Sequence, residues 1–567
     1  MEAARQIRLT RRTILKSSVA ATAAIALAAC GGAAPTPTPA SAAKATTGTS
    51  ATTSANTTTG AASSTSPTVA ASSGTATSPT VAAAGAQPKK GGTLKISQPI
   101  PITPFEFQQL GPHTATTILG VFDTLIRYDA KQQPQPWLAE SWSYNADKTE
   151  LTLKLRQGVL YHTGRAFTSD DVKFNLERVQ DPKVASQLAG QAKTITGMTL
   201  PDKQTIVLTF AQPNPAIFDA LNILAILDTA TAANLDGAKQ VIGTGPFVWK
   251  DYVPGSKVTL VRNDKYWQSG KPYLDGIELQ ITDDKQSMVT AVESGQRDLA
   301  WQALPQDLNR LKGNAQASGL VSDAGAQFYY IGVNTQGEGV TDKRVRQAFD
   351  AAIDRKRITD TLIFGLVPPD TIAWPHSSPA YNAAISNSVT FDLNKAKQLF
   401  QAAGVAPNTT FTIEVNAQDP INGKIAQIVQ SDLSTINIKL DIQSVENSVF
   451  QQRLQQAGFK QLFANTEGFS NFNPGAWFIT AYPVRIPDNA SKFTPPEYTD
   501  LIKKMQVEPD PTKLKALYDS MDTMLIDAAF NLCVCQAPQG WVLQKSVKGF
   551  TYDTFNFIQL GDVWLDK

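Results

Sequence analysis

Hydrophobic residues recur with two different periods between residue 91 and residue 567. Residues 151–155 (LTLKL) alternate apolar and polar side chains, which is typical of a strand with one buried face. Residues 168–179 instead open with the capping residue Thr168 and two aspartates, and their apolar residues then recur at helical spacing. The pattern predicts strands and helices mixed along one chain.

The same two patterns alternate through the rest of this stretch. Alternation predicts further strands at 206–210, 258–261, 277–281, 329–333, 411–415 and 438–442, and helical spacing predicts helices at 345–353, 392–404, 425–433 and 510–525. The helix at 425–433 lies between two strands, so we expect that unit to be parallel and right-handed. The predicted class is α/β with mixed sheets. The stretch is too long for one simple core, which favours two or three lobes.

The first thirty residues have a pattern of their own. Arg11 and Arg12 precede an apolar run at 19–29 that is too short to cross a hydrocarbon core of ~30 Å. A basic segment, a short apolar segment and small residues before a cleavage site are the parts of a signal peptide, and the arginine pair matches the twin-arginine export pattern. The ending LAAC resembles the bacterial lipobox. Residues 1–29 are therefore interpreted as a twin-arginine-like lipoprotein signal peptide, with Cys30 as the lipidation site.

Residues 30–90 are interpreted as the lipidated cysteine followed by a disordered tether. From residue 31 to residue 88 the chain is almost entirely Ala, Thr, Ser, Pro and Gly, and Lys44 is its only charge. Such a composition buries too little apolar surface to offset the entropy of ordering the backbone. A flexible chain of this length spans roughly 40–45 Å. The segment is expected to hold a globular part away from a membrane.

Charge and motif content exclude several function classes. The net charge of +2 argues against nucleic acid as a partner, because that would require a clustered basic face. The three histidines are widely separated and no HExxH or Cys/His cluster occurs, so we expect no metal site built from protein ligands. No G-x-S-x-G element, P-loop or kinase motif set is present either. Missing motifs do not exclude an enzyme, but nothing in the sequence calls for a cofactor or an enzymatic activity, and we expect neither.

Two local features carry separate expectations. Cys533 and Cys535 are two residues apart in an extended run and are expected to point along the same face, where a disulfide would be strained. They are interpreted as buried small hydrophobic residues. Gly243, Gly245 and Pro246 lie between apolar runs and predict a turn that a β-branched residue would not permit.

Several of these stretches resemble, in this order, the family 5 extracellular solute-binding proteins of ABC importers, which include peptide and nickel receptors. Tyr161 and Thr163 depart from the family's usual Phe and Asp. The resembling segments are Gly91–Leu94 (GGTL), Trp137–Trp142 (WLAESW), Leu155–Gly164 with Thr168–Arg178, Gly243–Phe247 (GTGPF), Arg262–Trp267 (RNDKYW), Ser294–Asp298 (SGQRD), Asn334 with Asp342–Arg355, and Lys395–Gly404. The resemblance covers nearly all of residues 91–567.

The resemblance implies a two-lobed periplasmic-binding-protein-like fold with an extra subdomain in lobe one, of the cluster C type. Lobe one would comprise 91–327 plus 529–567, and lobe two 328–528. A ligand would be enclosed between the lobes by hinge closure. The implied protein is a monomeric receptor outside the cytoplasm, in the periplasm or at the cell surface, anchored to the membrane by lipid and delivering its ligand to ABC permease subunits.

The family's peptide receptors meet the peptide ammonium with an aspartate four residues before a proline of lobe two. That proline resembles Pro474, which makes Ser470 the matching position. A hydroxyl does not offset the desolvation of an ammonium as a carboxylate does, so Glu467 is a candidate replacement. The other candidate ligand contacts are aromatic and amide side chains, namely Trp301, Trp374, Phe472, Asn473 and Trp477.

The serine leaves the ligand class open. A peptide or a similar small polar solute is the first hypothesis. An oligosaccharide suits the aromatic and amide candidates, and a metal chelate could dock on aromatics and arginine without a protein histidine. A sensor lipoprotein without a transport role and an enzyme built on the same scaffold are the remaining alternatives.

Overall fold

The computed structural model describes residues 87–99, 108, 114–129, 132–184, 186–234, 240–322, 327–468, 473–553 and 556–567. The predicted signal peptide, Cys30 and nearly all of the tether lie outside these residues, as do the candidate ligand residues Ser470 and Phe472. None of the described helices is both long enough and apolar enough to cross a membrane.

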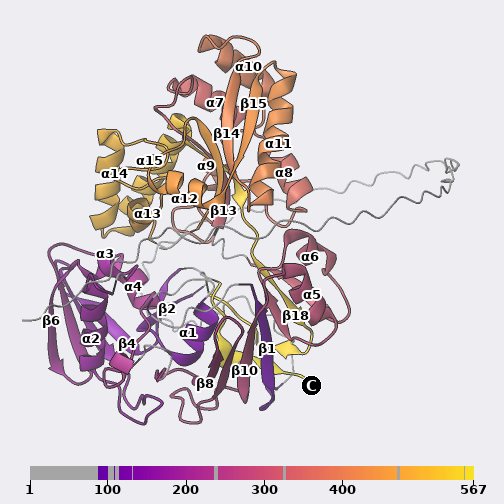
Figure 1. Ribbon diagram of the computed structural model, residues 1–567. Helices are drawn as coiled ribbons and strands as arrows, with labels where there is room; N and C mark the ends of the chain where they lie inside the picture. Colours follow the sequence, from indigo (N-terminus) through magenta and orange to yellow (C-terminus); the bar gives the residue numbers. More distant parts are fainter. Residues whose placement is uncertain are drawn as a thin grey trace, which may run out of the picture. The chain divides into compact units, whose positions relative to one another are not determined.

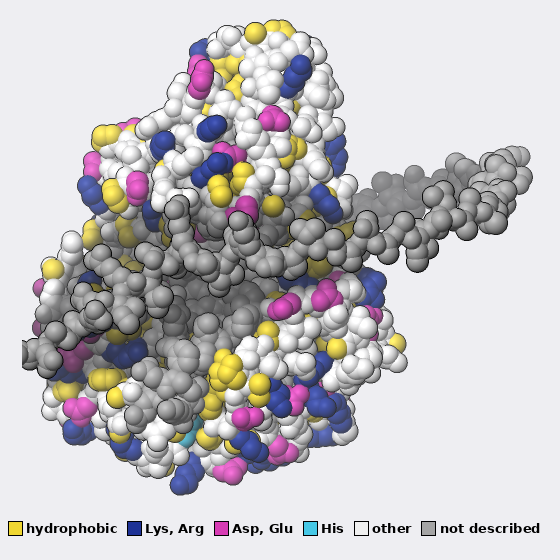
Figure 2. All heavy atoms as spheres, in the orientation of Figure 1, with side chains coloured by type: hydrophobic (Ala, Val, Ile, Leu, Met, Phe, Trp, Pro, Cys, Tyr) yellow, Lys and Arg dark blue, Asp and Glu magenta, His cyan; other side chains and the backbone are white. Residues whose placement is uncertain are grey.

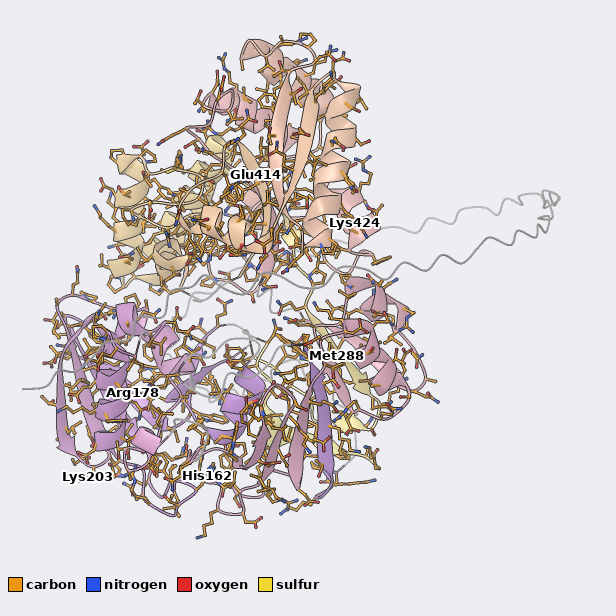
Figure 3. All side chains as sticks on the ribbon, in the orientation of Figure 1. His162, Arg178, Lys203, Met288, Glu414 and Lys424 are labelled. Atoms are coloured by element: carbon orange, nitrogen blue, oxygen red, sulfur yellow. The ribbon has the colours of Figure 1, made fainter. Side chains whose placement is uncertain are left out.

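The largest sheet has seven strands and combines parallel and antiparallel pairs. β1 runs parallel to β10 and β11, and the remaining neighbours are antiparallel. The strand order is β12 (Ala317–Val321), β18 (Gly540–Gln544), β11 (Leu299–Trp301), β1 (Thr93–Gln98), β10 (Gly276–Ile281), β9 (Lys257–Arg262) and β8 (Phe247–Val253) (Figure 1). The helix α5 (Lys285–Glu293) contacts β11 and β18 of this sheet, and α6 (Pro305–Arg310) contacts β12 and β18. Met288 of α5 lies in a small core between the two helices and the sheet (Figure 3).

A separate four-stranded antiparallel sheet is the extra subdomain expected in lobe one. Its strand order is β4 (Ala139–Tyr144), β5 (Glu150–Leu155), β7 (Thr205–Phe210) and β6 (Ile195–Asp202), and α2 (Ser169–Gln180) contacts β6 and β7. The helix predicted to start at the capping residue Thr168 does so, and the structure adds a capping box in which the Asp171 carboxylate accepts a hydrogen bond from the Thr168 backbone N–H at 3.0 Å. The smaller neighbouring elements are α1 (Ala115–Val121), β2 (Ile126–Tyr128), β3 (Pro134–Pro136), α3 (Ala189–Ala192), α4 (Ile217–Ile223), β19 (Val547–Lys548), β20 (Trp564–Leu565) and short 3-10 helices at Ala232–Asn234 and Leu560–Asp562.

Lobe two is built on a five-stranded mixed sheet. Its strand order is β15 (Lys439–Val445), β14 (Thr410–Asn416), β16 (Leu462–Gly468), β13 (Gln327–Val333) and β17 (Asn531–Gln536). β14 and β15 are parallel, as the predicted strand–helix–strand unit requires. The helices are α7 (Lys343–Ala351), α8 (Arg355–Leu362), α9 (Ala383–Ser386), α10 (Leu393–Ala402), α11 (Pro420–Thr435), α12 (Asn447–Gln455), α13 (Pro474–Thr480), α14 (Pro496–Val507) and α15 (Pro511–Ala528) (Figure 1).

Two hydrophobic cores lie on opposite faces of this sheet. Along β13, Tyr329 and Ile331 belong to one core, whereas Phe328 and Tyr330 belong to the other. This division follows from the alternation of side chains along a strand. Glu414 is buried on β14 and accepts a hydrogen bond from Arg453, which fixes α12 against the sheet (Figure 3).

The structure differs from the sequence expectations at two boundaries. The helix predicted at 345–353 ends at Ala351, and a second helix begins at Arg355 because Asp354 accepts a hydrogen bond from the backbone N–H of Arg357, at 2.9 Å. β17 follows residue 528 but pairs with β13, so this strand belongs to the sheet of lobe two. The return of the chain to the seven-stranded sheet therefore falls between β17 and β18, later than the boundary expected at 528.

Cys533 and Cys535 are buried and form no disulfide, as expected. The expectation that they share one face is wrong. The register of β17 against β13 shifts between Tyr329 and Tyr330, and Cys533 packs in one core while Cys535 packs in the other. A bulge inserts one residue and so reverses the facing of the residues beyond it. Burial raises the pKa of both thiols well above the ordinary value, which keeps them protonated.

Candidate functional site

Polar side chains gather where the parallel strands β14 and β16 end. Asp419 lies three residues beyond β14, and its carboxylate accepts hydrogen bonds from Asn422 Nδ2 at 2.6 Å and from Thr466 Oγ1 at 3.0 Å. Asn422 Nδ2 also lies 2.9 Å from Thr466 Oγ1, so the three side chains form one network. In open α/β sheets, ligands bind outside the carboxyl ends of the strands. This edge of the sheet is therefore the candidate ligand site.

Glu467 follows Thr466 on β16 and points to the other face of the strand. Its side chain is half-buried, and desolvation raises the pKa of its carboxyl to about 8, with a smaller lowering from a backbone hydrogen bond at Gly468. No described basic side chain contributes to this pKa. At pH 7 the group is mostly protonated, and an ammonium placed beside it would restore the carboxylate.

A lysine from the lobe-one part of the chain interacts electrostatically with this network. Lys285 is the first residue of α5, and burial lowers the pKa of its ammonium while the charge of Asp419 opposes that change. Asp419 also adds to the burial that raises the pKa of the Tyr329 hydroxyl. The network thus has one carboxylate, one ammonium and one neutral phenol, and the Glu467 carboxyl lies at the end of the same strand on its other face. Groups of both signs at this end of the sheet suit a ligand that carries charges of both signs.

Asn473 has a structural role at the start of α13. Its side-chain oxygen accepts a hydrogen bond from the backbone N–H of Ala476 at 3.1 Å, which caps the helix. Its backbone N–H donates to the carboxylate of Asp219 on α4 at 2.9 Å, and that carboxylate also accepts from the Tyr128 hydroxyl at 2.8 Å. Asn473 therefore ties lobe two to lobe one, and a ligand contact by its side chain remains a prediction.

The three candidate tryptophans lie in core positions. Trp374 and Trp477 pack edge to face, with ring centroids 5.1 Å apart, and Trp374 Nε1 donates to the buried carboxylate of Asp522 at 2.7 Å. Trp301 is buried on β11, opposite Trp541 of β18. The structure brings Trp374 and Trp477 together in one hydrophobic core and places Trp301 in another. A role for any of the three in ligand contact stays a prediction.

Glu467 was predicted from the sequence, whereas Asp419, Asn422, Thr466 and Lys285 were not. One signal was available for Asp419. It precedes Pro420 as Asp510 precedes Pro511, and both aspartates cap the helices that follow. Nothing in the local pattern of Lys285 distinguishes it from an ordinary exposed lysine, because its neighbourhood depends on the tertiary fold.

Comparison with known proteins identifies the family. Residues 133–483 match the model for bacterial extracellular solute-binding proteins, family 5. Di/tripeptide-binding protein 1 of Pseudomonas aeruginosa is 26% identical over 482 residues, covering 79% of this chain and 89% of the relative. The dipeptide-binding protein of Escherichia coli is 26% identical over 458 residues, covering 74% of this chain and 84% of the relative.

Solved structures show the same fold. The periplasmic binding protein DppA of Helicobacter pylori, in complex with the peptide STSA, aligns with a TM-score of 0.70 at 22% identity, covering 84% of this chain and 99% of that one. NikA of Brucella suis, in complex with Fe(III)-EDTA, aligns with a TM-score of 0.75 at 22% identity, covering 84% of this chain and 100% of that one. Both the family model and the fold agree with the two-lobed architecture, and the chain belongs to the family 5 bacterial extracellular solute-binding proteins.

Proposed function

We propose that this protein is the receptor of an ABC importer that captures a short peptide between its two lobes and delivers it to the permease subunits. The relatives named above are peptide-binding proteins, and this chain aligns with most of the length of each. The observation that carries the proposal is Glu467, whose carboxyl has a pKa of about 8 and no described basic partner at the end of β16. A peptide brings the ammonium that this carboxyl lacks.

Glu467 thus takes over the role that the family resemblance assigns to the position of Ser470. A carboxylate–ammonium hydrogen bond is worth about 1.5–3 kcal/mol, which corresponds to roughly 10–100-fold in affinity. Lys285 and Asp419 supply further charged groups around the same sheet edge, with Asp419 already bonded to Asn422 and Thr466. The rest of the affinity would come from the peptide main chain, which makes binding tolerant of sequence.

Titration calorimetry with tripeptides tests this proposal. The protein should bind a tripeptide with a free amino terminus and lose roughly 10–100-fold in affinity when that terminus is acetylated. Glu467→Gln should weaken binding of the free peptide by the same factor and leave the acetylated peptide unaffected. Glu497→Gln, which changes an exposed glutamate at the start of α14, is the matched control and should bind as the wild type does.

The protonation state of Glu467 gives a second readout. Because the free carboxyl is mostly protonated at pH 7, capture of an ammonium should release up to one proton, and the binding enthalpy should depend on the ionisation enthalpy of the buffer. Native mass spectrometry of the gently purified protein identifies what it carries. A ladder of peptide masses supports the proposal, whereas a single carbohydrate or metal-chelate mass would contradict it.

We further propose that the chain is exported, lipidated at Cys30 and held outside the cytoplasm by the tether that follows. This rests on the N-terminal sequence alone. Cys30→Ala should release the protein from the membrane fraction without changing its affinity for peptide. Unchanged membrane association would overturn the lipidation proposal and would leave the peptide proposal untouched.

A further inference from the structure

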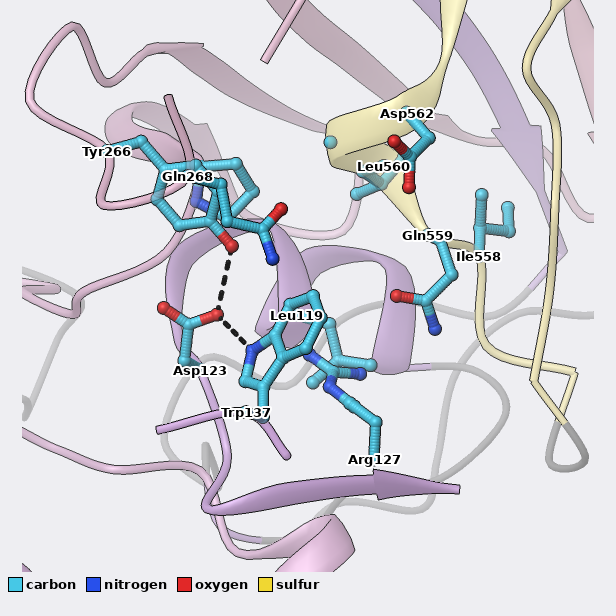
Figure 4. Close-up of a pocket in the computed structure, with 12 residues that line it drawn as sticks. Leu119, Asp123, Arg127, Trp137, Tyr266, Gln268, Ile558, Gln559, Leu560 and Asp562 are labelled. Atoms are coloured by element: carbon cyan, nitrogen blue, oxygen red, sulfur yellow. Dashed lines mark hydrogen bonds between the residues drawn. The ribbon is translucent and has the colours of Figure 1, made fainter. Parts of the chain in front are cut away.

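A small cavity in lobe one lies away from the sheet edge that forms the candidate ligand site. It is enclosed by α1, β2, the segment after β9 and the 3-10 helix at Leu560–Asp562 (Figure 4). Its volume is about 20 Å³, enough for one particle the size of a water molecule. The polar side chains that line it are Asp123, Arg127, Tyr266, Gln268, Gln559 and Asp562.

The acceptors around this cavity are already engaged. The Asp123 carboxylate is fully buried and accepts hydrogen bonds from Trp137 Nε1 at 2.7 Å, Trp267 Nε1 at 3.0 Å, Thr244 Oγ1 at 2.9 Å and the Tyr266 hydroxyl at 3.2 Å. Asp562 forms an ion pair with Lys271. Four neutral donors satisfy a buried carboxylate well, so Asp123 has little capacity left to accept a hydrogen bond from a cation.

Trp137 and Tyr266 donate to Asp123, but three other side chains with donor groups around the cavity, Arg127, Gln268 and Gln559, do not. Arg127 is 7% exposed, and its Nε has no hydrogen-bond partner. Its guanidinium lies 5.1 Å from the centre of the Trp137 ring, and it forms no ion pair with any carboxylate that the structure describes. The side-chain amides of Gln268 and Gln559 make no hydrogen bond to the described residues. Figure 4 shows these three side chains directed toward the same central space.

A buried guanidinium without a hydrogen-bonded counterion is costly, and stacking on an indole offsets only part of that cost. We infer that this cavity binds a small monovalent anion, either a halide ion or one oxygen of the carboxylate group of a small acid. Arg127 supplies the charge, and the Gln268 and Gln559 amides supply further N–H donors. The cavity volume favours small anions over larger ones. The site is separate from the proposed peptide site and does not depend on it.

Thermal unfolding of the purified full-length protein tests this inference. An anion that binds only the folded state raises Tm as its concentration rises. At constant ionic strength, sodium chloride should raise Tm saturably relative to sodium methanesulfonate, whose anion is larger than chloride and should fit the cavity less well. A response to sodium formate as well would indicate that carboxylate groups also enter, and a response to formate alone would identify the carboxylate as the ligand.

Arg127→Gln should abolish the difference in Tm between these salts. Arg156→Gln is the matched control, because Arg156 stacks on the neighbouring Trp267 ring at 4.6 Å but does not line the cavity. It should keep the wild-type response. Equal Tm values of the wild type in all salts, or a salt response retained by Arg127→Gln, would overturn the inference.

Anomalous scattering from wild-type crystals grown in sodium bromide keeps the inference testable if Arg127→Gln does not fold. A bromide peak within hydrogen-bond distance of Arg127 would support it. A water in the cavity with no anomalous peak, together with no response to formate, would overturn it.

Discussion

Asp522 on α15 is a fully buried carboxyl group whose second oxygen has no hydrogen-bond partner. Burial raises its pKa to about 7, and the neighbouring Asp519 adds to this shift, while the hydrogen bond from Trp374 and the charge of Lys515 oppose it. The folded state therefore favours the protonated form. The stability that the protonated Asp522 carboxyl contributes to the folded state is fully present below the unfolded pKa near 4, and it is lost as pH rises through about 7.

We therefore expect Asp522→Asn to stabilise the protein at pH 8 and to have little effect at pH 4. An amide keeps an oxygen for Trp374 Nε1 but does not ionise, so it avoids a buried charge. The gain at pH 8 should be on the order of 1–4 kcal/mol, since one pKa unit corresponds to ~1.4 kcal/mol. Urea unfolding curves at the two pH values measure it.

Asp527→Asn is the control for this prediction, because Asp527 lies on the same helix but is exposed. It should change stability by similar small amounts at both pH values. An equal effect of Asp522→Asn at pH 4 and pH 8 would show that Asp522 does not titrate in the folded state.

The turn before β8 shows why glycine occurs in the GTGPF segment. A Cβ on Gly243 would lie 2.1 Å from the carbonyl oxygen of Val121, and one on Gly245 would lie 2.5 Å from the Val121 carbonyl carbon. Neither glycine has a positive φ. The turn was predicted correctly from the sequence, but the reason given was the conformational freedom of glycine, whereas the structure shows that lack of space is the reason. These glycines are needed because the turn packs directly against the end of α1, where Gly245 N–H donates to Val121 O at 2.9 Å.

Gly243→Ala should therefore destabilise the protein by about 1–3 kcal/mol or more, because the backbone of Val121 cannot move without displacing α1. Gly190→Ala is the matched control. Gly190 is helical, and an added Cβ there would meet nothing within 4 Å. That substitution should be neutral or slightly stabilising, since alanine favours helix. Thermal unfolding of both variants measures the contrast, and equal Tm values would contradict the argument.

One exposed face made several elements predictable from sequence but did not decide the outcome. β13 was predicted although both of its faces are buried, and β6 and β8 were missed although each has exposed residues. β5, β7, β9, β14 and α2 have alternating or helical patterns, and the structure has them within a few residues of the predicted bounds. β16 was not predicted, because its residues from Leu462 to Asn465 are all buried and show no alternation. The bulge in β17 was also missed, since it depends on the register with β13.

The candidate site could likewise be predicted only in part. Glu467 could be named from sequence because the family resemblance identified Pro474 and the segment before it. Asp419, Thr466 and Lys285 come together only through the parallel pairing of β14 with β16 and the placement of α5. These contacts join residues that are between 47 and more than 130 positions apart in the chain. The local sequence pattern does not indicate contacts between residues so far apart in the chain.

The two lobes are joined by side-chain contacts as well as by the chain crossings. Asp219 on α4 accepts a hydrogen bond from Tyr128 within lobe one and another from the backbone N–H of Asn473 in lobe two. Asp219 is fully buried, so the second bond is shielded from water and from salt. Asn473 also caps α13, which means that this bond fixes the start of that helix against the other lobe.

Removing the Asp219 carboxylate should therefore loosen the start of α13. We expect Asp219→Ala to speed hydrogen exchange at the amides of Asn473 and the first turn of α13, because the N–H of Asn473 loses its acceptor. Tyr128→Phe is the matched control, since it removes the bond within lobe one and leaves the bond between the lobes. Hydrogen exchange followed by mass spectrometry resolves this segment. If Tyr128→Phe raised exchange there as much as Asp219→Ala does, the packing of α4 rather than the Asn473 bond would set the stability of this contact.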